Sequence, residues 1–338
     1  MNKSIKYNNI PIFLPELACR NKCIFCNQNK ITGVLNIPKP ADIPIIVEKY
    51  LATIPAENHV EIAFFGGSFT GIEIELQNAY LKEAFKFVEN QRVKGIRIST
   101  RPDYISTEIL DLLKNNGVKT IELGAQSTDD EILLKSNRGT TFYDIHKSAK
   151  LIKKYNFELG LQMMLGLPAD NLEKAIKTAN DFVDLKADNT RIYPALVIKN
   201  TELENLYLQG KYSPLSLDEA VFQAKEVFKI YHENSVNVIR VGLHQSEEFN
   251  SGESLVAGPY HQSFKELVLT ELWADILKEI ISEPNSEKFD IFVNSQQLSY
   301  AIGYKSKNKK WLENRGLKVN FYKDNNLKDF EINVCNSR

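Results

Sequence analysis

The sequence predicts an α/β protein in which a partial (β/α)6 barrel is followed by a small C-terminal α+β module. Strand-like apolar runs alternate with amphipathic helix-like runs, which is typical of right-handed βαβ units and a parallel sheet. Each strand candidate ends at Gly, Pro, Ser or Asp before the next helix begins. Unusual polar or glycine-containing loops follow most of these strands. The strand candidates are too few for a closed barrel, so we expect a partial one.

The elements follow one another in a regular order up to residue 200. The strand candidates are residues 10–14, 60–65, 95–99, 120–123, 159–164 and 191–197. Helices are expected between them at residues 43–53, 75–90, 106–116, 129–135, 142–155 and 171–185. Further on, the pattern predicts a helix, a strand-like run and a longer helix at residues 216–233, 236–243 and 263–281.

The remaining residues read as a strand, a helix, a turn, a helix and a strand. The corresponding segments are FDIFVN, SQQLSYAI, GYKS, KNKKWLEN and LKVNFYKD. The polar stretch SEPNSEK before them is typical of a linker. We therefore expect a barrel domain at residues 1–245, a helical extension at 246–283 and the small module at 284–338.

Composition limits the class of protein. Apolar residues make up 43% and charged residues 25% of the chain, and no apolar run approaches the length of a membrane helix. The N-terminal segment has no apolar core of a secretory signal, so a cytoplasmic, soluble protein is expected. The net charge of −1 argues against a whole-chain attraction to nucleic acid, although a local basic patch could still bind it.

Cys19, Cys23 and Cys26 form a CxxxCxxC cluster just after the first strand candidate. In a reducing compartment, thiols at this spacing are expected to bind metal rather than to form disulfides. A structural zinc site needs four protein ligands. Three thiolates can instead hold three irons of a [4Fe-4S] cluster and leave the fourth iron open. Cys335 is interpreted as an unrelated thiol.

Several loops at the expected carboxyl ends of the strands contain unusual residues. GGSFTG, TRPD, GAQS and GLP follow the second to fifth strands. Ligands bind at this edge of parallel α/β sheets, so these loops are candidates for one binding site. Each of them could equally be a turn in which Gly or Pro ends a strand.

Together these motifs resemble the radical S-adenosylmethionine (SAM) superfamily. Its signature is CxxxCxxC with an aromatic residue before the last cysteine, here Phe25. The order GGSFTG, STRPDY, ELGAQS, LGLP and YPALVIKNTELENLYLQGKY is similar to the radical domain of the Elongator catalytic subunit. It is also similar to bacterial proteins that resemble oxygen-independent coproporphyrinogen oxidase. The likeness covers residues 10–245 and implies a partial TIM-like barrel of the radical SAM type.

The resemblance also implies the cofactors and their ligands. Cys19, Cys23 and Cys26 would bind a [4Fe-4S] cluster, whose open iron would bind the amine and carboxylate of SAM. The loops would supply the other contacts with SAM: Gly66, Gly67, Ser68, Thr100, Arg101, Gln126, Met164 and Gly166. Several of these residues have ordinary structural alternatives, such as turns for the glycines and core packing for Met163 or Met164. Asp103 is expected either near SAM or at the N-cap of the next helix.

The implied reaction is reductive cleavage of SAM to a 5′-deoxyadenosyl radical that takes a hydrogen atom from the substrate. The electron would come from a donor such as flavodoxin or ferredoxin. RNA is the expected substrate, with tRNA as its first candidate. The alternatives are the same chemistry on a small molecule, or a non-catalytic RNA-binding iron-sulfur protein. The residues that follow the shared region are too few for the acetyltransferase domain of the Elongator subunit, so carboxymethylation of tRNA by this chain alone is not expected.

Two regions are candidates for substrate contact. Tyr193 and Lys199 lie in the shared YPALVIKN segment. The tail resembles a KH module, in which a GxxG loop approaches the RNA backbone. In this chain the loop is GYKS, so Gly303, Lys305 and Lys307 are candidates for RNA contact. Alternatively, the tail is a small packing module whose lysines form a solvated helix face.

Overall fold

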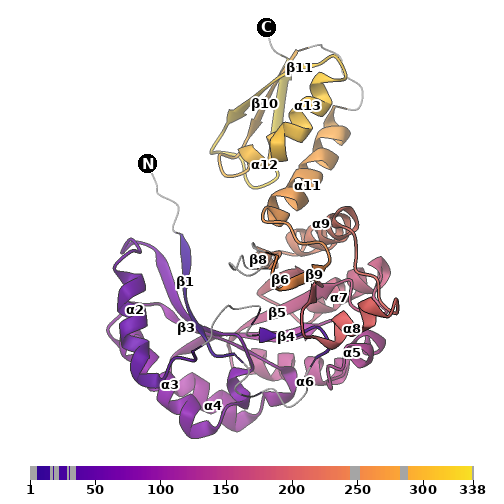
Figure 1. The fold of residues 1–338 in the computed structure, drawn as a ribbon. Helices are drawn as coiled ribbons and strands as arrows, with labels where there is room; N and C mark the ends of the chain where they lie inside the picture. The colour runs from indigo at the N-terminus through magenta and orange to yellow at the C-terminus, as the bar shows by residue number, and fades with distance from the viewer. Residues whose placement is uncertain are drawn as a thin grey trace.

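The computed structural model describes residues 6–15, 18, 23–28, 30, 36–243, 252–281 and 288–336. Its larger part is a half-barrel of seven parallel strands, so the predicted partial barrel is confirmed (Figure 1). The strands follow one another in the order β1 (Tyr7–Phe13), β2 (His59–Phe65), β3 (Gly95–Thr100), β4 (Val118–Gln126), β5 (Glu158–Leu165), β6 (Asn189–Pro194) and β8 (Asn237–Val241).

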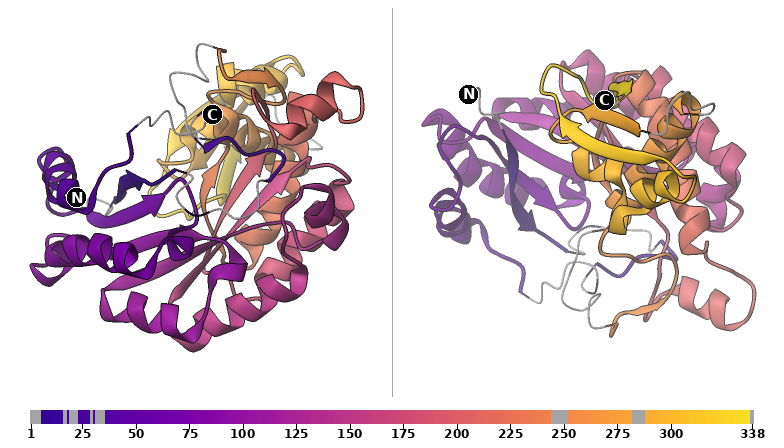
Figure 2. Two further views of the ribbon diagram at one scale, coloured as in Figure 1. Left: turned by 60° about the horizontal axis from the view of Figure 1, so that its bottom comes forward. Right: turned by 90° about the horizontal axis from the view of Figure 1, so that it is seen from above.

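Helices cover the convex side of this sheet (Figures 1 and 2). They are α2 (Ile43–Leu51), α3 (Ile74–Glu89), α4 (Thr107–Asn115), α5 (Asp130–Lys135), α6 (Phe142–Lys154), α7 (Leu172–Asp184) and α9 (Leu217–Glu233). The short helix α8 (Glu202–Leu208) packs instead in a separate cluster with Cys23 and Phe25. The predicted helices agree with these within a few residues, whereas α8 was not expected. Among the described residues, no helix combines the length and apolarity needed to cross a membrane.

Side chains along each strand alternate between the hydrophobic core and the concave face of the sheet. Ile10, Ile62, Ile98 and Leu123 are among the strand residues that pack with the helices in the main hydrophobic core. Because successive side chains of a strand point to opposite faces, the residues that alternate with these core residues along each strand face the concave side. That side carries charged and polar side chains, which are described below.

The strands that were not expected are short. The strand expected at 191–197 ends at Pro194, and β7 (Val197–Ile198) pairs instead with β9 (Leu255–Ala257) in a small antiparallel sheet. The run expected at 236–243 supplies the seventh strand of the barrel sheet, β8, and is therefore part of the barrel.

The C-terminal module has the predicted order of elements and one further strand. β10 (Lys288–Val293), α12 (Leu298–Ile302), α13 (Lys307–Glu313) and β11 (Lys318–Lys323) are followed by β12 (Ile332–Asn336). β10 lies in the centre, parallel to β11 and antiparallel to β12.

One long helix, α11 (Phe264–Ile280), belongs to two hydrophobic cores. Its first half supplies Phe264 and Val268 to the core of the barrel. Its second half supplies Trp273 and Leu277 to the core of the C-terminal module. The module and the barrel therefore share a helix rather than being joined only by a linker.

Candidate active site

A cavity of about 430 Å³ lies on the concave side of the sheet, at the carboxyl ends of its strands. Phe13 and Phe65 line it at the ends of β1 and β2. It brings together ten of the residues proposed from sequence: Cys23, Cys26, Gly66, Gly67, Ser68, Thr100, Arg101, Gln126, Met164 and Tyr193. Loops far apart in the sequence thus meet at one site, as expected for parallel strands.

Two cysteine thiols reach this cavity. Cys23 is buried and Cys26 is half-buried. The side chain of Gln28 donates a hydrogen bond from Nε2 to Sγ of Cys26, 3.3 Å away. Cys19 lies outside the described residues, and within the described ones no three potential ligands are grouped for a metal.

Two arginines lie beside Cys23. Arg138 donates from Nη1 to Sγ of Cys23 at 3.3 Å, and Nη1 of Arg101 lies 4.0 Å from the same sulfur. Arg101 also binds both carboxylate oxygens of Asp103, at 2.8 and 3.0 Å. Asp103 is not an N-cap, because Ser106 caps α4 by accepting from Ile109. Two guanidinium groups therefore lie within hydrogen-bond reach of the Cys23 thiol, and Asp103 neutralises one of them.

Arg138 differs from Arg101 in its partners. It is 5% exposed and also donates to the carbonyl of Gly124. Its Nε is buried without a hydrogen-bond partner, and among the described residues no carboxylate forms an ion pair with it. A buried cation without a carboxylate is costly, so this position fits an anionic ligand group.

Gln126 has an unusual backbone conformation. Its φ is +71°, in the left-handed region that non-glycine residues rarely adopt, and the register between β4 and β5 shifts between Gly124 and Gln126. The bulge directs the buried Gln126 into the cavity wall, where Oε1 accepts from Nε2 of Gln162 at 3.1 Å. Such strain is concentrated at functional sites.

The loop after β2 contributes both backbone and hydroxyl groups. Gly66 has a φ of +89°, which explains the need for glycine there, and it lines the cavity with Gly67 and the buried Ser68. Thr100, at the end of β3, makes a 2.6 Å hydrogen bond with the hydroxyl of Thr70. This bond ties the loops after β2 and β3 together.

The two methionines of β5 have different roles. Met164 lines the cavity, whereas Met163 is fully buried in the core and its sulfur accepts a hydrogen bond from Tyr231 at 3.0 Å. Gly166 is not among the cavity-lining residues. Its N–H donates to Asp170 at 2.7 Å and its carbonyl accepts from Tyr212 at 2.6 Å, so both of its polar groups serve the local fold.

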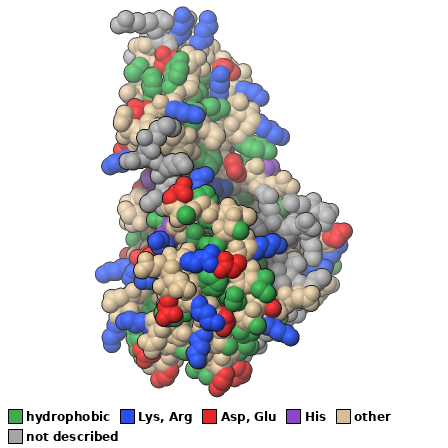
Figure 3. Space-filling view, turned by 90° about the vertical axis from the view of Figure 1, so that its left-hand side faces the viewer, with side chains coloured by type: hydrophobic (Ala, Val, Ile, Leu, Met, Phe, Trp, Pro, Cys, Tyr) green, Lys and Arg blue, Asp and Glu red, His purple; other side chains and the backbone are tan. Residues whose placement is uncertain are grey.

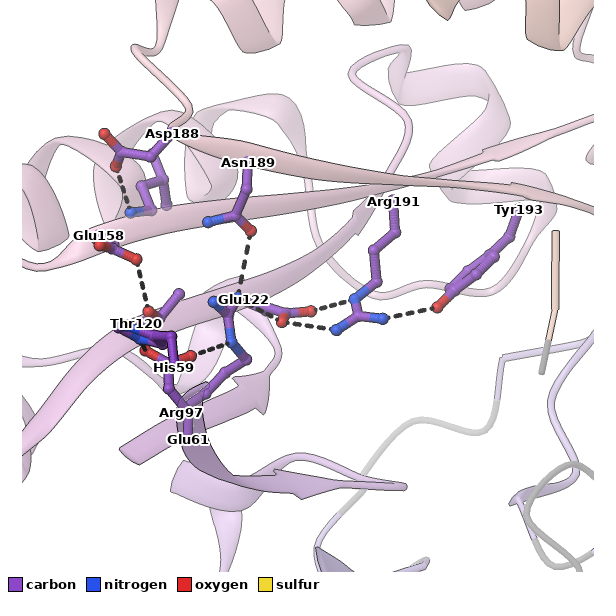
Figure 4. A network of polar contacts seen from close by, with 11 residues as sticks. His59, Glu61, Arg97, Thr120, Glu122, Glu158, Asp188, Asn189, Arg191 and Tyr193 are labelled. Atoms are coloured by element: carbon purple, nitrogen blue, oxygen red, sulfur yellow. Dashed lines mark hydrogen bonds and ion pairs between the residues drawn. The ribbon is translucent and has the colours of Figure 1, made fainter. Parts of the chain in front are cut away.

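A buried network of charged side chains lies on the concave face (Figure 4). Glu122 accepts from Arg97 at 2.8 Å and from Arg191 at 2.6 and 2.9 Å. Arg97 also donates to Glu61 at 3.0 Å, and Arg191 contacts the hydroxyl of Tyr193 at 3.4 Å. Glu122, Arg191 and Tyr193 line the cavity, so the network extends from the interior of the half-barrel to the site.

The network keeps both signs of charge in place. Burial alone would raise the pKa of Glu122, but Arg191 and Arg97 hold this pKa below its ordinary value. Burial alone would lower the pKa of Arg191, but Glu122 raises it. Glu122 is therefore ionised, and the concave face provides fixed charges rather than a proton donor.

The remaining candidates from sequence lie away from the cavity. Lys199 is exposed after β7, where its carbonyl accepts from the side chain of Asn27 at 3.2 Å. Gly303, Lys305 and Lys307 belong to the turn between α12 and α13 in the C-terminal module. Lys199 thus lies beside the cysteine loop without lining the cavity, and the three residues of the C-terminal module do not line it either.

Several lining residues were not predicted from the sequence: Glu122, Arg138, Gln162, Arg191 and Arg240. A signal for part of this set was present, because β2, β3, β4 and β6 each carry a central charge, and these charges alternate in sign. Arg138 gave no such signal, because it follows α5 and returns to the site only in the folded chain.

Comparison with known proteins agrees with this geometry. Residues 17–182 match the model of the radical SAM superfamily, and residues 187–274 match that of the Radical_SAM C-terminal domain. The chain belongs to the radical SAM superfamily. It is thus a radical SAM enzyme by family, and membership implies a [4Fe-4S] cluster and SAM as cofactors.

Curated relatives of the chain include proteins named tRNA uridine(34) acetyltransferase and Elongator complex protein 3. A tRNA uridine(34) acetyltransferase of Methanocaldococcus jannaschii is 28% identical over 246 residues, 61% of this chain and 46% of that protein. Elongator complex protein 3 of Homo sapiens is 30% identical over 182 residues, 48% of this chain and 33% of that protein. The chain thus spans less than half the length of these two relatives.

Similarity in structure concerns the fold alone. The archaeal Methanocaldococcus infernus Elp3 with an N-terminal deletion has a TM-score of 0.64 and 23% identity, over 80% of this chain and 63% of that one. The radical SAM half-barrel described above is thus a known architecture.

Proposed function

We propose that the chain is a radical SAM enzyme that modifies RNA, with tRNA as the first candidate. Cys19, Cys23 and Cys26 would hold the [4Fe-4S] cluster. When bound, the cluster and SAM supply a 5′-deoxyadenosyl radical for hydrogen abstraction. The proposal rests mainly on the Cys23 thiol, which lies at a cavity lined by loops that follow several strands in a member of this superfamily.

The residues present fit these cofactors chemically. Cysteine thiols are the ligands that iron-sulfur clusters use, and hydrogen bonds to sulfur tune such clusters. Arg138 and Gln28 already donate to Sγ of Cys23 and Cys26. Arg138 lines the cavity without a carboxylate partner among the described residues, and its guanidinium would suit a carboxylate such as that of the methionine moiety of SAM.

The other lining residues would orient the cofactor and exclude water. The amides of Gln126 and Gln162 can bond hydroxyl groups, and Met164 offers an apolar, polarizable surface. Phe13, Phe25 and Phe65 make much of the wall apolar, which keeps solvent away from a reactive species. Each of these functions requires only the side chains that already line the cavity.

RNA is favoured as the substrate by two observations. The curated relatives include proteins named for tRNA uridine modification. The C-terminal module at 288–336 carries nine basic and five acidic residues, whereas the whole chain has a net charge of −1. The proposal also expects a cytoplasmic location and a one-electron donor such as flavodoxin or ferredoxin.

Anaerobic reconstitution tests the cofactor part of the proposal. We expect about four irons per chain and release of 5′-deoxyadenosine from SAM after reduction with dithionite. Cys23→Ala and Cys26→Ala should lose iron, whereas Cys335→Ala should keep it because Cys335 is exposed in the C-terminal module. Zinc in place of iron, or no cleavage by a fully loaded chain, would contradict the proposal.

Mass analysis of RNA modifications tests the substrate part. A strain that lacks the gene should lose a modified nucleoside, and the wild-type gene should restore it, but not its Cys23→Ala form. An unchanged set of modified nucleosides, together with an altered metabolite, would point to a small-molecule substrate instead.

A further inference from the structure

The C-terminal module has one open sheet face. Phe289, Ile291 and Val293 of β10 are buried against the module's helices, so the residues between them point to the opposite side. We call this side the aromatic sheet face. It is formed by Lys288, Asp290, Phe292, Lys318, Asn320, Tyr322, Asn333 and Cys335.

An aromatic pair lies in the middle of this face. Phe292 and Tyr322 are register partners on β10 and β11, and their rings stack with centroids 5.3 Å apart and an interplanar angle of 26°. Tyr322 is 44% exposed. Asn333 of β12 lies opposite Phe292 on its other side and is exposed. A flat ring surface with an adjacent amide is thus presented to solvent.

Basic residues lie at one end of the same face. Lys288 and Lys318 are register partners, and both are exposed. Asp290 is the acidic residue of the face, and Asn320 donates to its Oδ1 at 3.0 Å. In Figure 3, hydrophobic side chains at the top of the molecule, where this module lies, are interspersed with those of Lys and Arg. The face therefore combines aromatic surface with positive charge.

We propose that the aromatic sheet face binds a single-stranded segment of RNA, an inference that rests on the proposed RNA substrate. Single-stranded bases stack on aromatic side chains displayed by a sheet, while nearby lysines contact the phosphates. Tyr322 supplies the exposed ring, Asn320 and Asn333 supply amides for base edges, and Lys288 and Lys318 supply positive charge.

The GYKS turn is a weaker candidate for the same role. Gly303 is buried, and a Cβ there would lie 2.8 Å from the backbone N of Asn308. The N–H of Tyr304 donates to Thr270 at 2.8 Å, and Lys307 forms an ion pair with Glu271. Packing against α13 and α11 thus explains the glycine, and contacts with α11 occupy groups that a KH-type loop would offer to RNA.

Fluorescence anisotropy of a short fluorescein-labelled oligouridylate with the full chain tests this inference. Tyr322→Ala should weaken binding roughly 5- to 100-fold, and Tyr322→Phe should restore it because the ring is kept. Tyr143→Ala, at an exposed tyrosine of α6, should bind like the wild type. Replacing Lys288 and Lys318 by Gln should make RNA binding less dependent on salt. The slope of the logarithm of the association constant against the logarithm of the salt concentration should fall in magnitude by about 0.7 for each phosphate that a lysine no longer neutralises.

Three outcomes would overturn the inference. The first is equal binding by the wild type and Tyr322→Ala. The second is a loss of binding only in a Lys305→Gln, Lys307→Gln double variant, which would assign RNA to the GYKS turn. In the third, light scattering shows that Tyr322→Ala dissociates a dimer without changing RNA affinity, so the face joins two copies of the chain.

An assay of SAM cleavage in the absence of RNA distinguishes a failure of this inference from a failure of the proposed function. Tyr322→Ala should release 5′-deoxyadenosine at the wild-type rate, because the face lies outside the cavity. If the loaded wild type fails to cleave SAM, the proposed function falls, whatever the RNA result. If cleavage is normal but Tyr322→Ala binds RNA like the wild type, only the sheet-face inference falls.

Discussion

Arg138 donates a hydrogen bond to Sγ of Cys23 from a buried position in which its Nε has no partner. The same guanidinium contacts the carbonyl of Gly124 through its other terminal nitrogen. A planar fork can reach both groups at once, which the single ammonium of a lysine cannot do. This geometry leads to the first prediction.

Arg138→Gln should weaken SAM binding by roughly 10- to 100-fold, because a charge-assisted hydrogen bond to the proposed carboxylate is lost. Arg138→Lys should restore only part of the affinity. Anaerobic equilibrium dialysis with SAM measures both variants, and their iron content shows whether the cluster is intact. Arg315→Lys, in the C-terminal module, is the control. Wild-type affinity in Arg138→Gln would contradict the assignment.

Glu122→Gln should lower the free energy of unfolding by about 3–5 kcal/mol, because it leaves two buried guanidiniums without their shared carboxylate. Urea unfolding measures this change. The control is Glu83→Gln, which removes the surface pair with Lys86 and should cost less than about 1 kcal/mol. Equal effects of the two variants would show that the network does not stabilise the half-barrel.

Asp170 should make stability depend on pH. Burial raises its pKa to about 6, despite hydrogen bonds from the backbone N–H groups of Gly166 and Asn171. Its contribution is therefore fully present below the unfolded pKa of 3.8 and is lost as the pH rises through about 6. The free energy of unfolding of the wild type, relative to Asp170→Asn, should fall between about pH 4 and pH 7.

Glu219→Gln is the matched control for this pH dependence. Hydrogen bonds from the backbone N–H and the hydroxyl of Ser216 lower the pKa of Glu219. Its contribution is lost only as the pH falls through the ordinary carboxylate range, so its difference from the wild type should be constant from about pH 5.5 to pH 7. A constant difference for Asp170→Asn as well would refute the assignment of its pKa.

Gln126 should show a conflict between stability and binding. Gln126→Gly and Gln126→Ala both remove the amide, so both should weaken SAM binding, roughly tenfold. Only glycine relieves the positive φ, so Gln126→Gly should be about 1 kcal/mol more stable than Gln126→Ala. Urea unfolding and equilibrium dialysis measure the two effects. Equal stability of the two variants would show that the bulge carries no strain at this residue.

The fold and the location of the site could be predicted because both depend on local pattern. Apolar runs ending in turns define the strands, and parallel strands bring their following loops to one edge. Gly66, Thr100 and Gln126 meet at the cavity for this reason. The short strands β7, β9 and β12 were missed because runs of two to five residues carry little periodicity.

The position of Arg138 depends on long-range packing, which the sequence pattern does not encode. Arg138 and Cys23 are 115 positions apart, and only the folded barrel brings them together. Gly166 was predicted to contact the cofactor because it lies in a recognisable motif, but it does not line the cavity. The structure explains that glycine by its φ of +77° and by close packing, since a Cβ there would lie 2.7 Å from the side chain of Leu215.

The sharing of α11 has a consequence for how the molecule unfolds. Removal of the module would leave Trp273 and Leu277 uncovered on a helix that the barrel still needs. The two parts should therefore melt in a single cooperative transition, and amide hydrogen exchange along α11 should report one opening energy for both of its halves. Ligand that stabilises the barrel would then also protect the distant β10 to β12 sheet from exchange.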